Sequence, residues 1–147
     1  MEEALSEAAR AADQGEVPAG AVLADAEGRL LGRGRNQVLT LADPTAHAEI
    51  MAIRAAASRV GNYRLTGHIL VSTLEPCPMC FMAAIHARVG RVIFGAPEPR
   101  WGAAGSLMDL SGLAGLNHRP IVRGGLMAEA ARKLITSFFL ARRKAFP

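Results

Sequence analysis

The only two cysteines of the chain, Cys77 and Cys80, stand three positions apart in the segment TLEPCPMC, at the start of a predicted helix. Side chains at i and i+3 of a helix lie on the same face, and the free N–H groups and dipole of a helix start favour thiolates. Two interpretations follow. A thioredoxin-like dithiol redox pair has this arrangement, and so does half of a zinc site that draws its other ligands from elsewhere.

A partner for the cysteines is found in His47-Ala48-Glu49, at the start of an earlier predicted helix. Zinc held by His47, Cys77 and Cys80 would have three protein ligands, and water would take the fourth tetrahedral position, as in catalytic zinc sites. Bound zinc lowers the pKa of such a water from about 15.7 to about 7. Glu49 is not needed as a ligand and can transfer protons, so these residues form a complete set for hydrolysis.

The composition is that of one globular domain, residues 1–147. Half of the residues (50%) are hydrophobic and 20% are charged, and no apolar run approaches the roughly 20 residues of a membrane span. The acidic N-terminus, MEEALSEAAR, does not resemble a signal peptide, and two cysteines do not make a disulfide framework. We therefore expect a cytoplasmic protein with no membrane partner.

The net charge of +4 is unevenly distributed along the chain. Residues 1–49 carry nine acidic and four basic side chains, whereas residues 50–147 carry four acidic and thirteen basic ones, mostly Arg. A general preference for Arg on solvated surfaces explains this distribution, and so does a basic surface that binds a polyanion such as nucleic acid. Composition leaves both interpretations open.

Alternating helices and strands must position these residues. The predicted helices cover residues 2–14, a segment beginning at Asp43-Pro44-Thr45, a segment from about Cys77, and residues 126–146. The predicted strands cover residues 19–25, 29–36, 68–73, 91–96 and 120–125. The first two strands form a hairpin, so we expect an α/β sandwich whose sheet opens antiparallel and continues parallel. The long loop 97–118 is expected to contain a short helix around 106–110.

The segments around the candidate ligands match the H-x-E…P-C-x-x-C signature of zinc-dependent nucleobase deaminases. Further similarity covers EVPAGAVL, DPTAHAEIMAIR, AAIHARVGRVIFGA, GAAGSLMDL, NHRP and FFLARRK. In these segments the chain resembles the bacterial tRNA-specific adenosine deaminases, members of the cytidine-deaminase-like superfamily. The resemblance implies a three-layer α/β/α sandwich with a central mixed five-stranded sheet. It also implies one zinc ion per chain, a homodimer, and a tRNA anticodon stem-loop as substrate.

The same resemblance assigns roles to individual residues. His47, Cys77 and Cys80 would bind zinc, and Glu49 would transfer protons while adenosine at the wobble position becomes inosine. The residues implied to contact the substrate are Asn36, Ala48, Glu98, Arg100, Trp101, Phe139, Arg142 and Arg143. The stretch Pro97–Trp101 departs from the usual family sequence, and Trp101 either stacks on an unpaired base or packs within the protein.

Three other functions remain open at this point. A guanine deaminase is one, because P-C-P-M-C also occurs in such enzymes, although the basic second half of the chain argues against a free base as substrate. An inactive zinc-binding subunit would typically lack the acid/base that Glu49 provides. A thioredoxin-like protein would leave both His47 and Glu49 without a purpose.

Overall fold

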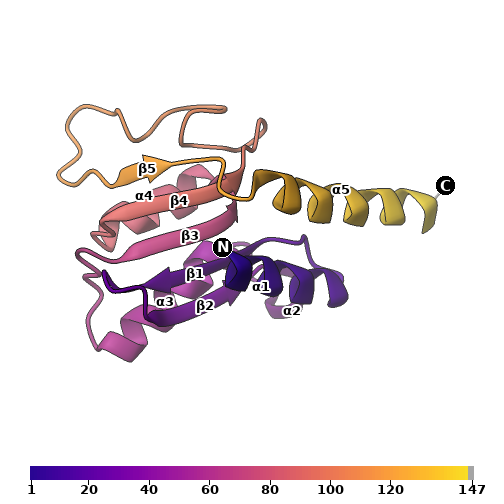
Figure 1. Ribbon diagram of the computed structural model, residues 1–147, viewed down its shortest axis with the longest axis horizontal. Helices are drawn as coiled ribbons and strands as arrows, with labels where there is room; N and C mark the ends of the chain where they lie inside the picture. The colour runs from indigo at the N-terminus through magenta and orange to yellow at the C-terminus, as the bar shows by residue number, and fades with distance from the viewer. Residues whose placement is uncertain (146–147) are drawn as a thin grey trace.

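Five strands form one mixed sheet in a computed structural model that describes residues 1–145 (Figure 1). The strands are β1 (Gly20–Ala24), β2 (Leu30–Arg35), β3 (Ile69–Leu74), β4 (Arg91–Ala96) and β5 (Ile121–Arg123). Their order is β2-β1-β3-β4-β5, with β1 antiparallel to both β2 and β3, and β4 parallel to both β3 and β5. The predicted hairpin and the change to parallel pairing are confirmed.

Helices cover both faces of this sheet. They are α1 (Glu2–Asp13), α2 (Val38–Leu41), α3 (Ala48–Val60), α4 (Pro78–His86) and α5 (Ala128–Ala145). The helix α1 packs on β1 and β2 and contacts α5, whereas α3 packs on the same two strands and contacts α4. Gly20 faces α1 and the next residue, Ala21, packs with α3, so the two helix pairs lie on opposite faces. The expected three-layer α/β/α sandwich is confirmed.

Close packing against glycine fixes both of these helices on the sheet. A Cβ atom on Gly34 would lie 2.1 Å from the carbonyl oxygen of Ala48 and 2.4 Å from the amide nitrogen of Ala52. A Cβ atom on Gly20 would lie 2.0 Å from the carbonyl oxygen of Ala4. Only glycine allows the helix backbone to approach the strand this closely. The start of α3 is thereby held against β2.

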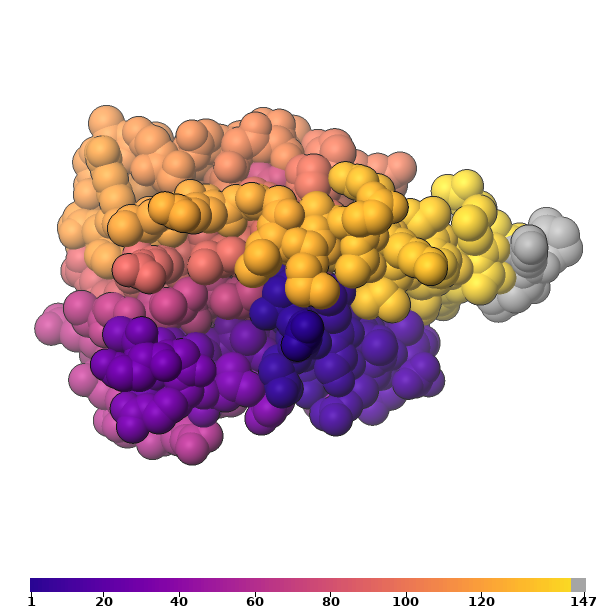
Figure 2. All heavy atoms as spheres, in the orientation of Figure 1, coloured from indigo at the N-terminus to yellow at the C-terminus, as the bar shows by residue number. Residues whose placement is uncertain are grey.

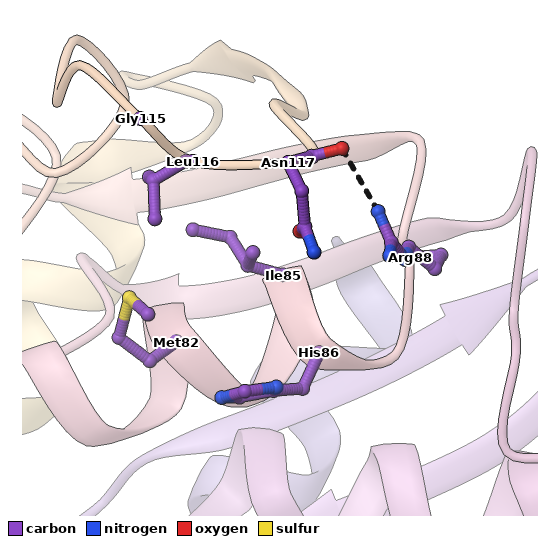
Figure 3. A pocket seen from close by; sticks show the side chains of 7 residues that line it. All are labelled: Met82, Ile85, His86, Arg88, Gly115, Leu116 and Asn117. Atoms are coloured by element: carbon purple, nitrogen blue, oxygen red, sulfur yellow. Dashed lines mark hydrogen bonds between the residues drawn. The ribbon is translucent and has the colours of Figure 1, made fainter.

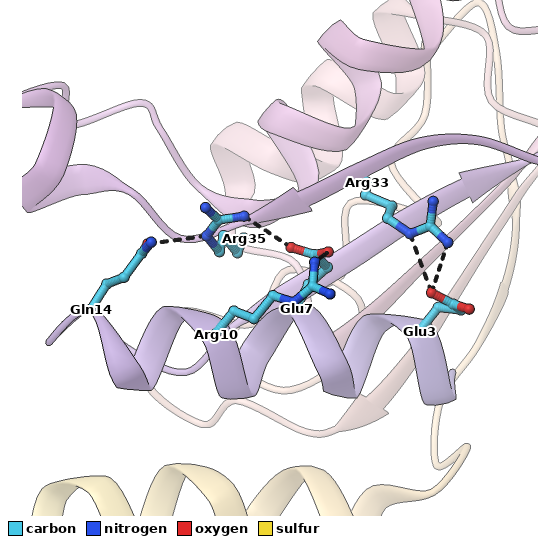
Figure 4. Close-up of polar contacts among 6 residues, drawn as sticks. All are labelled: Glu3, Glu7, Arg10, Gln14, Arg33 and Arg35. Carbon is cyan, nitrogen blue, oxygen red and sulfur yellow. Dashed lines mark hydrogen bonds and ion pairs between the residues drawn. The ribbon is translucent and has the colours of Figure 1, made fainter.

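Ion pairs also join α1 to β2, the strand at one edge of the sheet (Figure 4). Arg33 Nη2 lies 2.9 Å from Glu3 Oε2, and Arg35 Nη1 lies 3.2 Å from the buried carboxylate of Glu7. Arg10 donates to the other oxygen of Glu7. Five of the basic and acidic side chains of the first segment are thus paired within the fold.

The helix predicted from Asp43 begins later, at Ala48, and this expectation is corrected. The carboxylate of Asp43 accepts hydrogen bonds from the N–H and hydroxyl of Thr45, which makes a turn in place of a first helical turn. The short helix α2 precedes this turn and was not predicted. His47 then has an extended backbone, with φ −74° and ψ 154°, and caps α3.

The short helix expected around residues 106–110 is absent, and this prediction was wrong. Gly105 has φ +127°, its N–H donates to the carbonyl of Met108, and Ala104 pairs with Asp109, so the chain makes a tight reversal. The last helix starts at Ala128, since Gly125 and Met127 have positive φ. Its predicted last residue, Phe146, lies outside the described residues. Figure 2 shows α5 projecting beyond the rest of the molecule.

No helix within residues 1–145 combines the length and the hydropathy that crossing a membrane requires.

Candidate active site

Two helix starts bring the three predicted metal ligands together. His47 is the N-cap of α3, and Cys77 is the N-cap of α4, with Cys80 in the first turn of the same helix. Pro78 occupies the first helical position, where its missing N–H costs nothing. Because α4 follows directly after β3, the cysteines lie at the carboxyl end of that strand, where ligands bind in open α/β sheets.

The distances between these side chains fit zinc. The Sγ atoms of Cys77 and Cys80 each lie 3.6 Å from Nδ1 of His47, and all three ligand atoms are within 4.8 Å of one another. Zinc bonds of about 2.3 Å to sulfur and about 2.0–2.1 Å to nitrogen, at the tetrahedral angle, separate the two ligand atoms by about 3.6 Å. This donor set and its spacing therefore match a tetrahedral zinc site with three protein ligands.

His47, Cys77 and Cys80 form the ligand cluster, which carries a thiolate at neutral pH. A hydrogen bond from Cys80, supported by one from His47, lowers the pKa of Cys77 to about 4. The same hydrogen bond and burial raise the pKa of Cys80, while hydrogen bonding to Cys77 raises the pKa of His47. Zinc binding would displace the proton that remains on Cys80, because only deprotonated thiols coordinate the metal.

Glu49 lies next to the ligand cluster without belonging to it. It is the second residue of α3, its side chain is buried, and it lines the same cavity as His47 and Cys77. Burial raises the pKa of Glu49, since the charged form loses its contact with water. A carboxyl group whose pKa is raised toward neutrality both accepts and donates protons, which suits a general acid/base.

A groove of about 1140 Å³ opens beside these residues. All of the substrate-contacting residues that the sequence predicted line it: Asn36, Ala48, Glu98, Arg100, Trp101, Phe139, Arg142 and Arg143. Of the predicted metal and catalytic residues, only the fully buried Cys80 is not part of the lining. Trp101 is 65% exposed at the groove, so the alternative of a packing role for its ring is not supported.

Several residues that line the groove were not predicted as site residues. They are Glu16, Val17, Ala19, Val38, Leu39, Pro44, Leu74, Glu75, Pro78, Met79, Ile135, Thr136 and Leu140. Most are apolar side chains that a pattern of buried positions would assign to the core. Glu16 carried a usable signal, because a carboxylate directly before an apolar strand needs a partner. Arg142 lines the groove and also contacts other parts of the protein. It donates a hydrogen bond to the carbonyl of Gly15 at 3.3 Å, and its guanidinium lies over the half-buried ring of Phe138.

Glu75 anchors the loop that carries Arg100 and Trp101. Its buried carboxylate accepts hydrogen bonds from the backbone N–H groups of Glu98, Ala104 and Ser106, and from the Ser106 hydroxyl. Burial opposes the ionisation of Glu75, but these hydrogen bonds outweigh it and lower its pKa. Glu75 therefore acts as a structural hydrogen-bond acceptor in this loop.

The remaining histidines lie away from the ligand cluster. His68 and His118 donate to the carbonyl oxygens of Thr66 and Val89, which are structural contacts. His86 is exposed and lines a smaller cavity of about 270 Å³ between α4 and the loop at Leu116 (Figure 3). Within residues 1–145, His47, Cys77 and Cys80 are the only such group of potential metal ligands.

An α/β/α sandwich that presents His-x-Glu and Pro-Cys-x-x-Cys at two adjacent helix starts defines a zinc-dependent deaminase. Residues 1–96 match the cytidine and deoxycytidylate deaminase zinc-binding region family. Two curated relatives are similar to nearly the whole of this chain. The chain is 42% identical to the tRNA-specific adenosine deaminase of Haemophilus influenzae, over 98% of this chain and 83% of that protein. It is 48% identical to the tRNA(Ile)-lysidine synthase of Deinococcus radiodurans over 99% of this chain, and spans about a quarter (25%) of that protein.

Solved structures of deaminases are also similar to this chain. A structure from studies of A-to-I editing by tRNA:A34 deaminases at the wobble position of transfer RNA has a TM-score of 0.88 and 42% identity. The similarity covers 91% of this chain and 96% of that one. Guanine deaminase from Bacillus subtilis is more distant, with a TM-score of 0.63 and 31% identity over 97% of this chain and 90% of that one. The chain therefore belongs to the tRNA-specific adenosine deaminases of the zinc-binding deaminase family.

Proposed function

We propose that this chain, as a single domain of residues 1–147 in the cytoplasm, deaminates adenosine to inosine at the wobble position of a tRNA anticodon loop. One observation carries the proposal: His47, Cys77, Glu49 and a set of basic and aromatic side chains all border one groove. A groove of about 1140 Å³ has room for a base and its neighbouring nucleotides. An anticodon loop is single-stranded, so turning one base outward costs less than in a duplex.

Zinc held by His47, Cys77 and Cys80 would supply a Lewis acid that ionises water near neutral pH. Glu49 would accept a proton from the attacking water and deliver one to N1 of the purine ring. After the oxygen has bonded to C6, Glu49 would take the remaining proton of that oxygen and deliver it to the amine that leaves C6. Adenosine and water are thereby converted to inosine and ammonia, and the carboxylate returns to its starting state.

The walls of the groove would hold the substrate in place. Asn36 and the backbone at Ala48 would contact the extruded base. Trp101 and Phe139, which are 65% and 43% exposed, offer ring faces on which unpaired bases stack. Arg100 and Arg143 would contact phosphates, which position the strand without reading its sequence.

A homodimer is the assembly that we propose. The loop between β4 and β5 exposes three large apolar side chains, Leu107, Met108 and Leu113, which are 40–50% exposed. A second copy of the chain would cover them. Analytical ultracentrifugation of the purified chain should give twice the 15.5 kDa chain mass, and a sedimenting monomer at micromolar concentration would contradict this assembly.

The decisive assay offers the purified protein two substrates separately. One is a tRNA anticodon stem-loop with adenosine at the wobble position, and the other is guanine. We expect inosine in the RNA and no turnover of guanine. A matched stem-loop with its adenosine in the paired stem controls for base extrusion and should remain unmodified. Turnover of guanine with the RNA intact would replace our proposal by guanine deamination.

A further inference from the structure

A buried carboxylate outside the metal site touches the pocket residue Asn36. Glu16 is 1% exposed, directly precedes the segment that leads into β1, and lines the groove. Its Oε2 atom accepts a hydrogen bond from Nδ2 of Asn36 at 3.1 Å. Its Oε1 atom accepts the backbone N–H of Thr40 at 2.7 Å, in the last residues of α2. One carboxylate thus joins three parts of the groove wall.

The charge of Glu16 determines which way the Asn36 amide faces. Burial opposes the ionisation of Glu16, but hydrogen bonds from Thr40, Leu39 and Asn36 outweigh it and lower its pKa. An ionised carboxylate has acceptors only, so the NH₂ group of Asn36 must face it. The carbonyl oxygen Oδ1 is therefore the free end of the amide.

That free oxygen is in contact with the groove. Asn36 is 8% exposed and lines the groove, and Oδ1 has no hydrogen-bond partner among residues 1–143. In the same part of the chain, every buried side-chain nitrogen or oxygen has a partner. Oδ1 is consequently not buried, and it meets solvent or substrate in the groove. The backbone of this wall is also fixed, because the N–H groups of Asn36 and Gln37 donate to the carbonyls of Ala19 and Ala46.

We propose that Glu16 is a positioning residue that locks Asn36 with its carbonyl oxygen toward the substrate, so that the groove selects a nucleoside with an N–H or O–H donor at that point. This inference rests on the proposed function for its substrate, but the orientation of Asn36 is a property of the protein alone. Glutamine at position 16 has the same shape and offers either an acceptor or a donor. Asn36 would then be free to turn its amide over.

The test is a double-mutant cycle with Glu16→Gln and Asn36→Ala, assayed on the wobble stem-loop. Glu16→Gln alone should lower kcat/KM about tenfold to a hundredfold, mostly through KM, as expected for a charge-assisted hydrogen bond. In the Asn36→Ala background the same change should cost less than about twofold. Equal losses in both backgrounds, or no loss in either, would overturn the proposal.

A matched control is Glu7→Gln, which also removes a buried carboxylate but lies on α1 among Arg10 and Arg35. It should leave KM for the stem-loop unchanged. Zinc content and melting temperature are measured for every variant, so that loss of the fold is not mistaken for loss of positioning.

A second readout does not depend on the reaction. In ¹⁵N-edited NMR spectra of the full chain, one Asn36 side-chain N–H should resonate downfield as a charge-assisted donor, and it should lose this shift in Glu16→Gln. An unchanged resonance would contradict the locked amide whatever the kinetics show. If the wild-type protein leaves the stem-loop unmodified, the proposed function fails, and the NMR result alone decides this inference.

Discussion

Glu49 is the residue whose surroundings define its chemistry most clearly. The Glu49→Gln variant keeps the shape of the side chain but cannot accept a proton. We expect the rate of deamination to fall by at least about a hundredfold, within the range that general acid/base groups contribute. Zinc should remain at about one ion per chain by atomic absorption, because Glu49 is not among the ligand atoms.

The matched control makes the same substitution at Glu129, which is exposed on α5. Glu129→Gln should be fully active. Activity in Glu49→Gln close to that of the wild type would remove Glu49 from the proton-transfer role.

The metal ligands connect chemistry with stability at this same scale. His47 and Cys77 cap two different helices, so a metal that binds both also joins α3 to α4. Treating the zinc-loaded protein with a chelator should abolish deamination and lower the melting temperature by several degrees. Zinc added back should restore both, whereas magnesium should restore neither, because it prefers oxygen ligands. Activity that persists after complete removal of zinc would exclude the proposed chemistry.

At the scale of elements, the position of α3 depends on a strand residue that has no side chain. In the Gly34→Ala variant, the new Cβ would lie 2.1 Å from the Ala48 carbonyl oxygen, so α3 must move away from β2. Because His47 and Glu49 lie at the start of α3, we expect lower activity and a loss of about 1–3 kcal/mol in the free energy of unfolding. Urea denaturation and the stem-loop assay measure the two effects.

Gly112 gives the matched control, since a Cβ there would meet only the Asp109 carboxylate, at 3.6 Å, in ordinary contact. Gly112→Ala should therefore match the wild type in both measurements. A Gly34→Ala protein with full stability and activity would show that α3 does not need this close approach.

The loop that follows β4 depends on Glu75 in a way that pH reveals. Its folded-state pKa is below the ordinary value of 4.5, so its contribution to stability is complete above that value. The contribution is lost as the pH falls through the lower folded pKa. Glu75→Gln should therefore be less stable than the wild type at pH 7, by about 1–3 kcal/mol, and the difference should shrink at acidic pH. Urea denaturation at pH 7 and pH 3.5 tests this, and a difference that grows on acidification would contradict it.

The sequence predicted the candidate metal ligands His47, Cys77 and Cys80 because each belongs to a short motif at a helix start. It also predicted the five strands to within one or two residues, since each strand is a short apolar segment between turns. It did not reveal α2 or the late start of α3, because the Asp43–Thr45 turn competes with helix formation. The hydrogen bonds that Glu16 accepts from Asn36, and that Glu75 accepts from the loop, join residues 20 or more positions apart, and no local pattern encodes them.

At the scale of the whole molecule, much of the negative charge of the first segment is buried or paired with arginine. Of its nine acidic residues, Glu7, Glu16, Asp25 and Glu49 are buried, and Glu3 and Asp25 are paired with Arg33 and Arg29. The arginines at the groove are left to act on a polyanion. We therefore expect the affinity for the stem-loop to fall steeply with salt concentration.

Arg143→Ala should reduce the slope of log K against log[salt] by about 0.7, the value for one phosphate contact to a single strand. Arg91→Ala is the control and should leave the slope unchanged. Arg91 is exposed at the amino end of β4, whereas the groove follows the carboxyl ends of the parallel strands. Fluorescence anisotropy with a labelled stem-loop gives the slopes. Equal slopes for Arg143→Ala and the wild type would place the phosphate contacts elsewhere.

The groove is built from two stretches of chain that differ in what they contribute. Its metal ligands and Glu49 all come from within residues 1–96, the part that matches the deaminase family. The later wall, from Glu98 to Trp101 and from Ile135 to Arg143, contributes neither a metal ligand nor a proton carrier. If the proposed function holds, substitutions in this later wall would change which nucleic acid is bound and leave the reaction the same. The substrate preference of such a protein could therefore change in evolution without a change in its metal ligands or in Glu49.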